Sequence, residues 1–293
     1  PWRPGLAAYH FHRPPRSFRN HSDMGIMHTP EEVREFARTH EMTTTAAHAR
    51  GYMQANLLSL PSAYAFDFLL FAQRNPKPCP IVGVLEAGQY TSDLLPGGDI
   101  RTDIPAYRIF ENGEHTATLA DATSYYTPDM VSFLIGCSFT FETALVDAGI
   151  EIAHIAQQRN VPMYRTNIPT TPAGVFSGPM VVSMRPIPAS QVSDAVRITS
   201  RYPSVHGAPV HVGDPAAIGI ADLAHPDFGD AVDIPEGCLP VFWACGVTPQ
   251  AIVMESKPDL AISHAPGKML VTNARDAEYL IPEALTRHGI FSP

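Results

Sequence analysis

The spacing of hydrophobic positions changes along the chain between the helical period of about 3.6 residues and the strand period of two. Segments typical of helices are 29–40, 45–60, 128–147, 189–199 and 248–256. Short apolar segments typical of strands are 81–86, 107–110, 114–119, 150–155, 179–184, 209–212, 241–244 and 260–263. The apolar run over residues 63–74 fits either a buried helix or a buried strand.

Local signals support several of these assignments. Thr29 stands before Pro30 and two glutamates, which is the residue order expected at a helix start. The turn Glu111-Asn112-Gly113 lies between two strand-like segments and predicts a hairpin. Strands and helices alternate in the second half of the chain. This alternation predicts mixed α/β layers, some of them with parallel strands.

Composition and charge restrict the class of protein. The chain has 293 residues, enough for about two domains. It is 45% hydrophobic and 17% charged, which supports a sizeable core and excludes a largely disordered chain. No apolar run approaches the roughly 18 residues that a membrane span needs. The 29 prolines lie in short motifs and predict many rigid loops.

The net charge of −9 is unevenly distributed. Residues 1–28 hold four arginines and one aspartate, a net charge of +3, which leaves −12 for the remainder. Because residues 29–293 are this acidic, they are a poor candidate for binding nucleic acid. We interpret residues 1–28 as a disordered or foreign extension, with Met24 or Met27 as the natural start. The alternative is part of a transit peptide, which would place the protein in the mitochondrial matrix.

Four cysteines without a CxxC motif indicate a reducing compartment, so the cytoplasm is the expected location. Two of the cysteines lie in segments that echo each other, FLIGCSFT at 133–140 and VFWACGVT at 241–248. Each segment precedes a predicted helix, and the echo indicates that the first predicted helix breaks near Cys137. A cysteine at a helix N-terminus feels the positive end of the helix dipole, which favours the thiolate. Alternatively, Cys137 and Cys245 are small core residues.

The segment 159–167 concentrates polar residues in a chain with few cations. It contains Arg159, Asn160, Arg165 and Asn167. Because an arginine fork matches the geometry of a carboxylate, the segment predicts a carboxylate-binding loop. The alternative is a structural loop with salt bridges. Arg185 is a further candidate for binding an anion.

A second polar cluster contains His206, His211 and Asp214. Two histidines and one carboxylate form a known type of metal site, so a divalent metal is an alternative here. However, positions five apart on an extended segment point to opposite faces. Two other interpretations stay open. One histidine could act in acid–base chemistry or orient a substrate, or both could be ordinary loop histidines. The sequence has no GxGxxG, GxxxxGK[ST], HExxH or GxSxG motif.

Several motifs in one collinear order, over roughly residues 29–275, resemble the hydro-lyase family to which the D-glutamate cyclases of mitochondria are similar. These motifs are QANLL at 54–58, FAQRNPKPCP at 71–80, RTD at 101–103, IGCSF at 135–139, RNVPMYRTN at 159–167, VSMRP at 182–186, HGAPVH at 206–211, WACGVTPQ at 243–250 and SHAPG at 263–267.

The resemblance implies a two-part α/β fold, with a three-layer αβα domain and a smaller two-layer α/β domain. We expect residues 29–155 and 226–293 in the three-layer domain and residues 156–225 in the smaller one. The resemblance also implies an enzyme that removes water. In the cyclase, the α-amine of D-glutamate attacks the γ-carboxyl group of the same molecule, giving 5-oxo-D-proline and water.

For such a reaction the carboxylates must be held and protons must move. We expect Cys137 and Cys245 to face each other as acid and base, or one of them to act as nucleophile, with a histidine as the alternative proton carrier. The predicted catalytic residues are Cys137, Cys245, His206 and His264. The predicted substrate-binding residues are Ser138, Arg159, Asn160, Tyr164, Arg165, Asn167, Arg185 and Thr248.

No cofactor is expected, apart from the alternative metal. The expected partner is a small carboxylate substrate rather than a nucleic acid or a membrane, and a homo-oligomer is left open. Three other functions stay open. They are a metal-dependent dehydratase of a hydroxy acid, a cofactor-independent amino-acid racemase or isomerase, and a non-catalytic amino-acid-binding protein.

Overall fold

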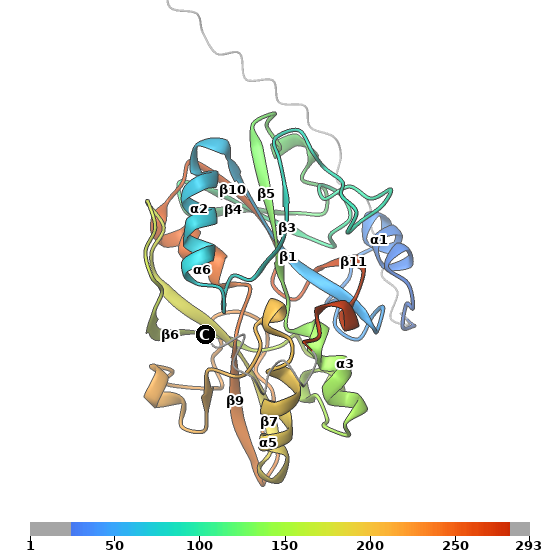
Figure 1. Cartoon of the computed structure of the whole chain (residues 1–293), viewed down its shortest axis with the longest axis vertical. Coiled ribbons are helices and arrows are strands. Elements are labelled where there is room, and N and C mark those ends of the chain that lie inside the picture. Colours follow the sequence, from blue (N-terminus) through green and yellow to red (C-terminus); the bar gives the residue numbers. More distant parts are fainter. Residues whose placement is uncertain (1–24, 282–293) are drawn as a thin grey trace, which may run out of the picture.

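Two antiparallel sheets organise residues 25–281, the part of the chain that the computed structural model describes (Figure 1). The larger sheet has the strand order β2-β5-β1-β10-β3-β4, and β11 pairs with the other end of β1. Its strands are β1 (Tyr52–Pro61), β2 (Ile81–Leu85), β3 (Tyr107–Glu111), β4 (Glu114–Leu119), β5 (Met130–Gly136), β10 (Leu260–His264) and β11 (Leu270–Arg275).

The two faces of the larger sheet are covered differently. Helices α2 (Ser62–Arg74) and α6 (Thr248–Ser256) pack side by side on one face, where aromatic residues of α2 meet Ile252 of α6 in a buried cluster. The other face is covered by the long loop after β2, through Leu95 and Ile100. Helix α1 (Pro30–Thr39) lies against β11. The central strands are therefore buried on both sides.

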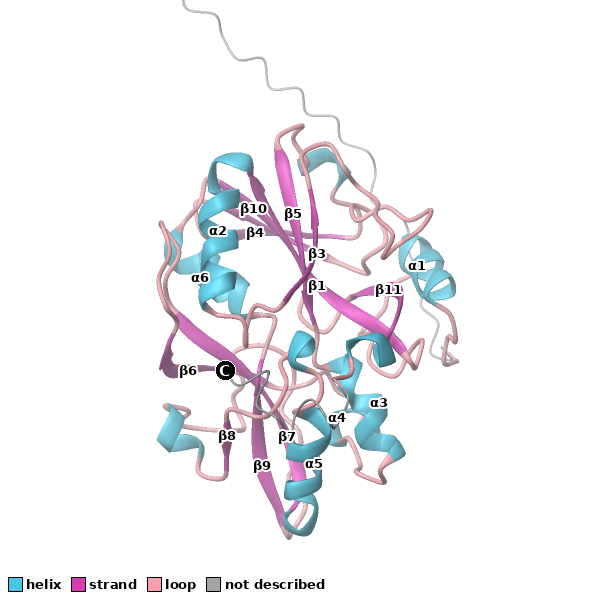
Figure 2. Cartoon of the chain, viewed as in Figure 1, coloured by secondary structure: helices cyan, strands magenta, loops and turns pink. Residues whose placement is uncertain are grey.

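The smaller sheet has the order β6-β7-β9-β8 (Figure 2). Helices α3 and α5 pack on one face around Trp243, and the loop that contains Ile218 covers the other. The strands are β6 (Met163–Pro169), β7 (Pro179–Pro188), β8 (His211–Val212) and β9 (Cys238–Ala244). The helices are α3 (Phe139–Asp147), α4 (Ala153–Ala156) and α5 (Val192–Thr199). Short 3-10 helices are η1 (Thr123–Tyr125), η2 (Ala189–Gln191), η3 (Pro203–Val205), η4 (Pro215–Ile218) and η5 (Asp276–Tyr279).

Each sheet is covered in part by a helix that follows a strand of the other sheet. Strand β5 belongs to the larger sheet, but α3, which follows it, packs on the smaller sheet. Strand β9 belongs to the smaller sheet, but α6, which follows it, packs on the larger sheet. Because each strand leads into a helix that covers the other sheet, both helix N-termini lie where the two sheets meet.

Many of the predicted elements are confirmed. Helix α1 begins as predicted, and Thr29 and Glu32 form a reciprocal capping box. The hairpin of β3 and β4 and the helices α5 and α6 also occur where the sequence placed them. The run 63–74, which fitted either element, is helix α2. The two-part α/β fold class is confirmed by the two sheets and their helices.

Four expectations are wrong. The predicted helix 45–60 is mainly β1, because its apolar residues are buried on both faces of a central strand and therefore do not alternate. The predicted helix 128–147 is β5 followed by α3, with the break at Cys137 that the echo indicated. The predicted strand 150–155 does not form, because residues 150–152 have no regular structure and the short helix α4 begins at Ala153. Every strand pair among the described residues is antiparallel, so the predicted parallel strands do not occur.

The predicted domain boundaries stay a prediction. The sheet to which each strand belongs is relevant to them. Strand β9 pairs in the smaller sheet, whereas the predicted division put residues 226–293 into the larger domain. Of the predicted extension 1–28, residues 1–24 lie outside the described residues. Met27 is hydrogen-bonded through its backbone to His48 and Ala49. Among the described helices, none has the length and hydrophobicity to cross a membrane.

Candidate functional site

The two echoed cysteine segments meet at the junction of the sheets. Cys137 follows β5 and Cys245 follows β9, and both side chains lie in one buried cluster, 6% and 7% exposed. The Cys137 N–H donates to the carbonyl of Gln54 on β1, and the Cys245 N–H donates to the carbonyl of Val181 on β7. Each cysteine is therefore hydrogen-bonded to the strand that neighbours its own, β1 for the segment after β5 and β7 for the segment after β9. The structure brings these predicted residues together, and their catalytic roles stay predictions.

Both thiols are protonated at neutral pH. Burial raises the pKa of Cys137 well above its usual range and that of Cys245 to about 11. The nearby Arg185 guanidinium acts in the opposite direction on both, and the Phe139 N–H approaches the Cys137 sulfur at 3.5 Å. The expectation that the helix dipole favours the thiolate is therefore wrong, since the loss of water outweighs it. These thiols can donate protons.

Asn56, on the central strand β1, holds the two cysteine segments together. Its Nδ2 donates to the carbonyls of Ile135 and Gly136, 3.1 and 2.9 Å away, just before Cys137. Its side chain also packs directly on Gly246, where an added Cβ would lie 1.9 Å from Asn56 Nδ2. Only glycine allows this approach. Asn56 lies in the QANLL motif but is not among the site residues predicted from the sequence.

Three buried polar atoms without a hydrogen-bond partner among the described residues lie around the segment 264–267. They are His264 Nε2, Gln250 Oε1 and Asn160 Oδ1. Gln250 Nε2 donates to the His264 carbonyl, and Asn160 Nδ2 donates to the Pro266 carbonyl. A Cβ at Gly267 would lie 2.1 Å from Asn160 Oδ1, so this backbone also approaches very closely. Buried polar atoms are rarely left unpaired, so we interpret these three as groups that bind a ligand.

His264 is uncharged at neutral pH. Its Nδ1 lies 3.2 Å from the backbone nitrogen of Leu57 and 3.3 Å from the carbonyl oxygen of the same residue. Burial lowers the pKa of His264 to about 4, and the charge of Arg108 acts in the same direction. The ring can therefore accept a proton at one nitrogen while the other is held by the backbone.

Arg185 is buried in a charged network beside the cysteines. Its guanidinium donates to one oxygen of Glu142, at 2.8 and 2.5 Å, and to Ser138 Oγ at 3.0 Å. His154 Nε2 lies 3.3 Å from the same Glu142 oxygen. Burial alone would raise the pKa of Glu142, but His154 and Arg185 lower it. Because Arg185 is paired with an internal carboxylate, its contacts support the start of α3 next to Cys137.

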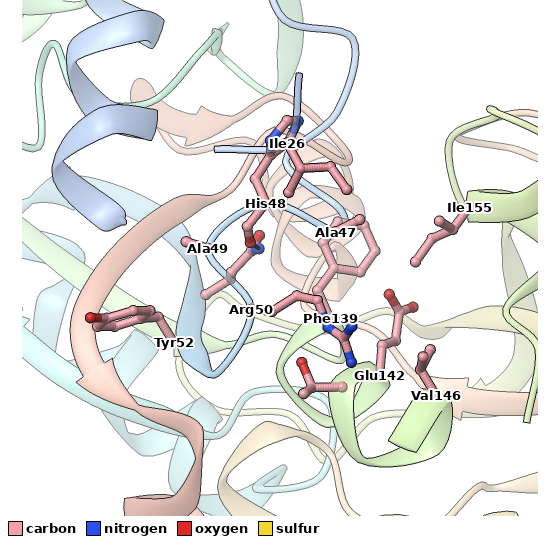
Figure 3. Close-up of a pocket in the computed structure, with 12 residues that line it drawn as sticks. Ile26, Ala47, His48, Ala49, Arg50, Tyr52, Phe139, Glu142, Val146 and Ile155 are labelled. Carbon is pink, nitrogen blue, oxygen red and sulfur yellow. Dashed lines mark hydrogen bonds between the residues drawn. The ribbon is translucent and has the colours of Figure 1, made fainter. Parts of the chain in front are cut away.

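A cavity of about 200 Å³ opens on the other side of α3 (Figure 3). Its wall is mainly apolar, and the Glu142 carboxylate projects into it between Phe139 and Ile155. Gln54 and His48 also line it. Burial lowers the pKa of His48, so this histidine does not supply a positive charge at neutral pH. Arg50 also lines the cavity, but its guanidinium is paired with Asp147 at 2.7 Å, and the Glu142 carboxylate adds a negative charge. The cavity therefore offers a dicarboxylate no unpaired cation among its lining residues.

The two arginines of the predicted carboxylate-binding loop have their own partners. Arg159 donates to the Ala231 carbonyl at 2.7 Å and lies 3.5 Å from Asp233. Arg165 lies 3.6 Å from Glu255 and contacts Met254. These contacts fit the structural alternative with salt bridges, although residues 163–167 of the predicted loop belong to strand β6. A substrate-binding role for either arginine stays an untested prediction.

Other predicted binding residues have mainly structural contacts. Tyr164 is buried and donates to the Leu223 carbonyl, and Asn167 is exposed and packs against Gly219. Thr248 is buried, and its hydroxyl donates to the Cys245 carbonyl at 2.7 Å, which fixes the start of α6. Of the predicted binding set, the junction gathers Ser138, Asn160, Arg185 and Thr248.

The alternative metal ligands do not converge. His206 is buried, has a φ of 84°, and contacts the Lys77 carbonyl at 2.8 Å. His211 contacts the backbone carbonyl of Asp214, whose carboxylate caps Ala216. No group of three metal-ligating side chains occurs within residues 25–281. Burial lowers the pKa of His206 to about 4, so it too is uncharged at neutral pH.

Residues 131–273 match a family model described as D-glutamate cyclase. Proteins named "Putative hydro-lyase" are similar over most of the chain. That of Corynebacterium urealyticum is 68% identical over 87% of this chain and 97% of its own length. Those of Corynebacterium jeikeium and Mycolicibacterium gilvum are 66% and 63% identical, over 87% of this chain and 94% and 97% of their own lengths.

A crystal structure of a nitrogen repressor-like protein from Methanococcus jannaschii aligns with 75% of this chain and 87% of its own, at 8% identity and a TM-score of 0.35. At that score the similarity carries no argument about fold or function.

Proposed function

The chain belongs to the hydro-lyase family of these relatives, a family of carbon–oxygen lyases, and on this premise we propose that it removes water from a small acidic amino acid. The proposed substrate is D-glutamate and the product 5-oxo-D-proline. In this reaction a bond forms between the amine nitrogen and the γ-carbon, and a bond from that carbon to oxygen breaks. Two protons pass from the ammonium group to the departing oxygen, which leaves as water.

The observation that carries this proposal is the meeting of two buried cysteines at the junction where the strand that ends in His264 also terminates. Cys137 and Cys245 lie in one buried cluster, and His264 ends a strand at the same junction. The reaction needs a proton donor for the departing oxygen and an acceptor for the amine protons. The thiols supply the donor. His264 accepts a proton through Nε2 when its Nδ1 donates to the Leu57 carbonyl.

The surroundings of these groups suit this chemistry. Asn56, Gly136 and Gly246 fix the relative position of the thiols, because their contacts leave no room for movement of either segment. The unpartnered oxygens of Gln250 and Asn160 can accept hydrogen bonds from the substrate ammonium group. Burial excludes water, which would otherwise compete in the reverse direction, the hydrolysis of the lactam.

The test is a mass-spectrometric screen of D- and L-acidic amino acids and hydroxy acids for loss of one water molecule. We expect conversion of D-glutamate. Cys137→Ser and Cys245→Ser, assayed separately, should each lower kcat by at least about a hundredfold. Cys238→Ser is the control, because Cys238 lies at the far end of β9 and is half-buried. Full activity in both junction variants would remove the thiols from the mechanism.

Paired thiols also fit a cofactor-independent racemase, which is the second candidate. A racemase would exchange the α-hydrogen of the substrate with solvent deuterium, whereas cyclisation does not require that exchange. Incubation in deuterium oxide followed by mass spectrometry separates the two. We keep the cytoplasm as the proposed location, because all four cysteines are unpaired.

A further inference from the structure

Arg108 is a half-buried cation without a counterion. It lies on β3, directly opposite Ser263 of β10, so the two side chains share a face of the larger sheet. No carboxylate within ion-pair distance and no hydrogen-bond acceptor of its guanidinium is found among residues 25–281. The centre of the Phe228 ring lies 5.8 Å from the guanidinium carbon.

The other buried and half-buried arginines among the described residues each have a carboxylate or carbonyl partner. The chain has 29 acidic residues against 20 lysines and arginines, so carboxylates are abundant. Within residues 25–281, two arginines are fully buried, and each lies against a carboxylate: Arg34 against Asp103 and Arg185 against Glu142. Burial of Arg108 lowers its pKa, which shows that the charged form loses solvation in the fold. A bound anion would compensate for that loss.

The groups around Arg108 belong to the proposed active site. Its charge acts on His264, whose Nε2 is buried and unpartnered. Phe228 packs against the cluster that contains both junction cysteines and restricts the guanidinium from one side. A ligand held by Arg108 would therefore lie within reach of the thiols.

We propose that Arg108 forms a carboxylate-binding subsite that holds the unreactive carboxylate of the substrate, which in D-glutamate is the α-carboxylate. The Arg108 fork provides two parallel N–H donors for the carboxylate oxygens. The Phe228 ring, 5.8 Å from the guanidinium carbon, bounds the subsite on one side. This subsite rests on the proposed function, and it makes Arg108 a specificity-determining residue.

The binding test uses glutarate, a dicarboxylate that has no amine and cannot cyclise. Titration calorimetry on the full chain should show that Arg108→Gln weakens glutarate binding about tenfold to a hundredfold, the usual value of a hydrogen-bonded charge. The Kd of Arg108→Lys should lie between that of the unaltered chain and that of Arg108→Gln, because lysine keeps the positive charge but loses the paired N–H donors of arginine. Arg197→Gln is the control, since Arg197 is exposed and paired with Asp194 on α5. An unchanged Kd for Arg108→Gln, or no glutarate binding by the unaltered chain, would overturn the subsite.

A substrate comparison separates recognition from a structural effect. With D-glutamate, Arg108→Lys should raise KM more than it lowers kcat. With the α-amide of D-glutamate, which lacks the negative charge, the unaltered chain and Arg108→Gln should show the same KM. A variant that lowers kcat equally for both substrates would mean a structural role and refute the subsite. Glutarate binding that depends on Arg108 without any dehydration would refute the proposed function and leave the subsite standing.

Discussion

Replacing Gly246 by alanine tests how Asn56 joins the two halves of the site. The new methyl group would lie 1.9 Å from Asn56 Nδ2 and 2.2 Å from its Cγ, far inside contact distance. Asn56 must then move, and its hydrogen bonds to the carbonyls of Ile135 and Gly136 break. Each lost hydrogen bond costs about 1 kcal/mol, and strain from overpacking costs about 1–3 kcal/mol more. We expect Gly246→Ala to lower the free energy of unfolding by about 3–5 kcal/mol.

The assay is urea unfolding of four proteins: the unaltered chain, Gly246→Ala, Asn56→Ala and the double variant. Asn56→Ala removes the three atoms that the methyl group would meet. The cost of Gly246→Ala should therefore fall below about 1 kcal/mol in the Asn56→Ala background. Gly25→Ala is the control, since an added Cβ there meets no atom within 4 Å. Equal costs of Gly246→Ala in both backgrounds would refute the proposed contact.

Three further predictions concern the charges and thiols of the junction. Glu142→Gln leaves Arg185 buried without an anion and should cost about 3–5 kcal/mol in urea unfolding, whereas an effect below about 1 kcal/mol would mean that the ion pair contributes little. Because burial lowers the pKa of His206 to about 4 from an unfolded value near 6.5, its contribution to stability is complete above pH 6.5 and is lost as the pH falls to 4. That loss is about 3 kcal/mol, so His206→Gln should flatten the dependence of unfolding free energy on pH in this window, and an unchanged slope would contradict the assignment. The half-buried Cys238 should react with iodoacetamide at neutral pH well before the buried Cys245, as followed by mass spectrometry of the labelled peptides, and equal rates would show that Cys245 is accessible.

Local signals in the sequence predicted local structure well. The capping box at Thr29 and the turn at Asn112-Gly113 involve residues close together in the chain, and both elements occur where expected. The echo of the cysteine segments also located the starts of two helices and the meeting of Cys137 with Cys245. The protonation of these thiols could not be predicted, because it depends on how much water the surrounding residues exclude.

The contacts that build the site join residues far apart in the chain. Asn56 packs on Gly246, and Asn160 packs on Gly267, from different elements. Nothing in the local pattern around Asn56 distinguishes it from other polar residues of a buried strand. Likewise, Arg108 lies in a strand with ordinary alternation, and it becomes a candidate only because the described part of the fold offers its guanidinium no carboxylate partner. The strand β1 itself was misread because burial on both faces removes the period of two.

The central claim is that this junction removes water from an acidic amino acid. The most direct measurement is mass spectrometry of D-glutamate incubated with the purified chain, run beside Cys137→Ser and Cys245→Ser. We predict that D-glutamate loses the mass of one water molecule with the unaltered chain, and that either substitution abolishes most of this conversion. Unchanged D-glutamate would contradict the proposed substrate, and equal conversion by all three proteins would contradict the proposed site.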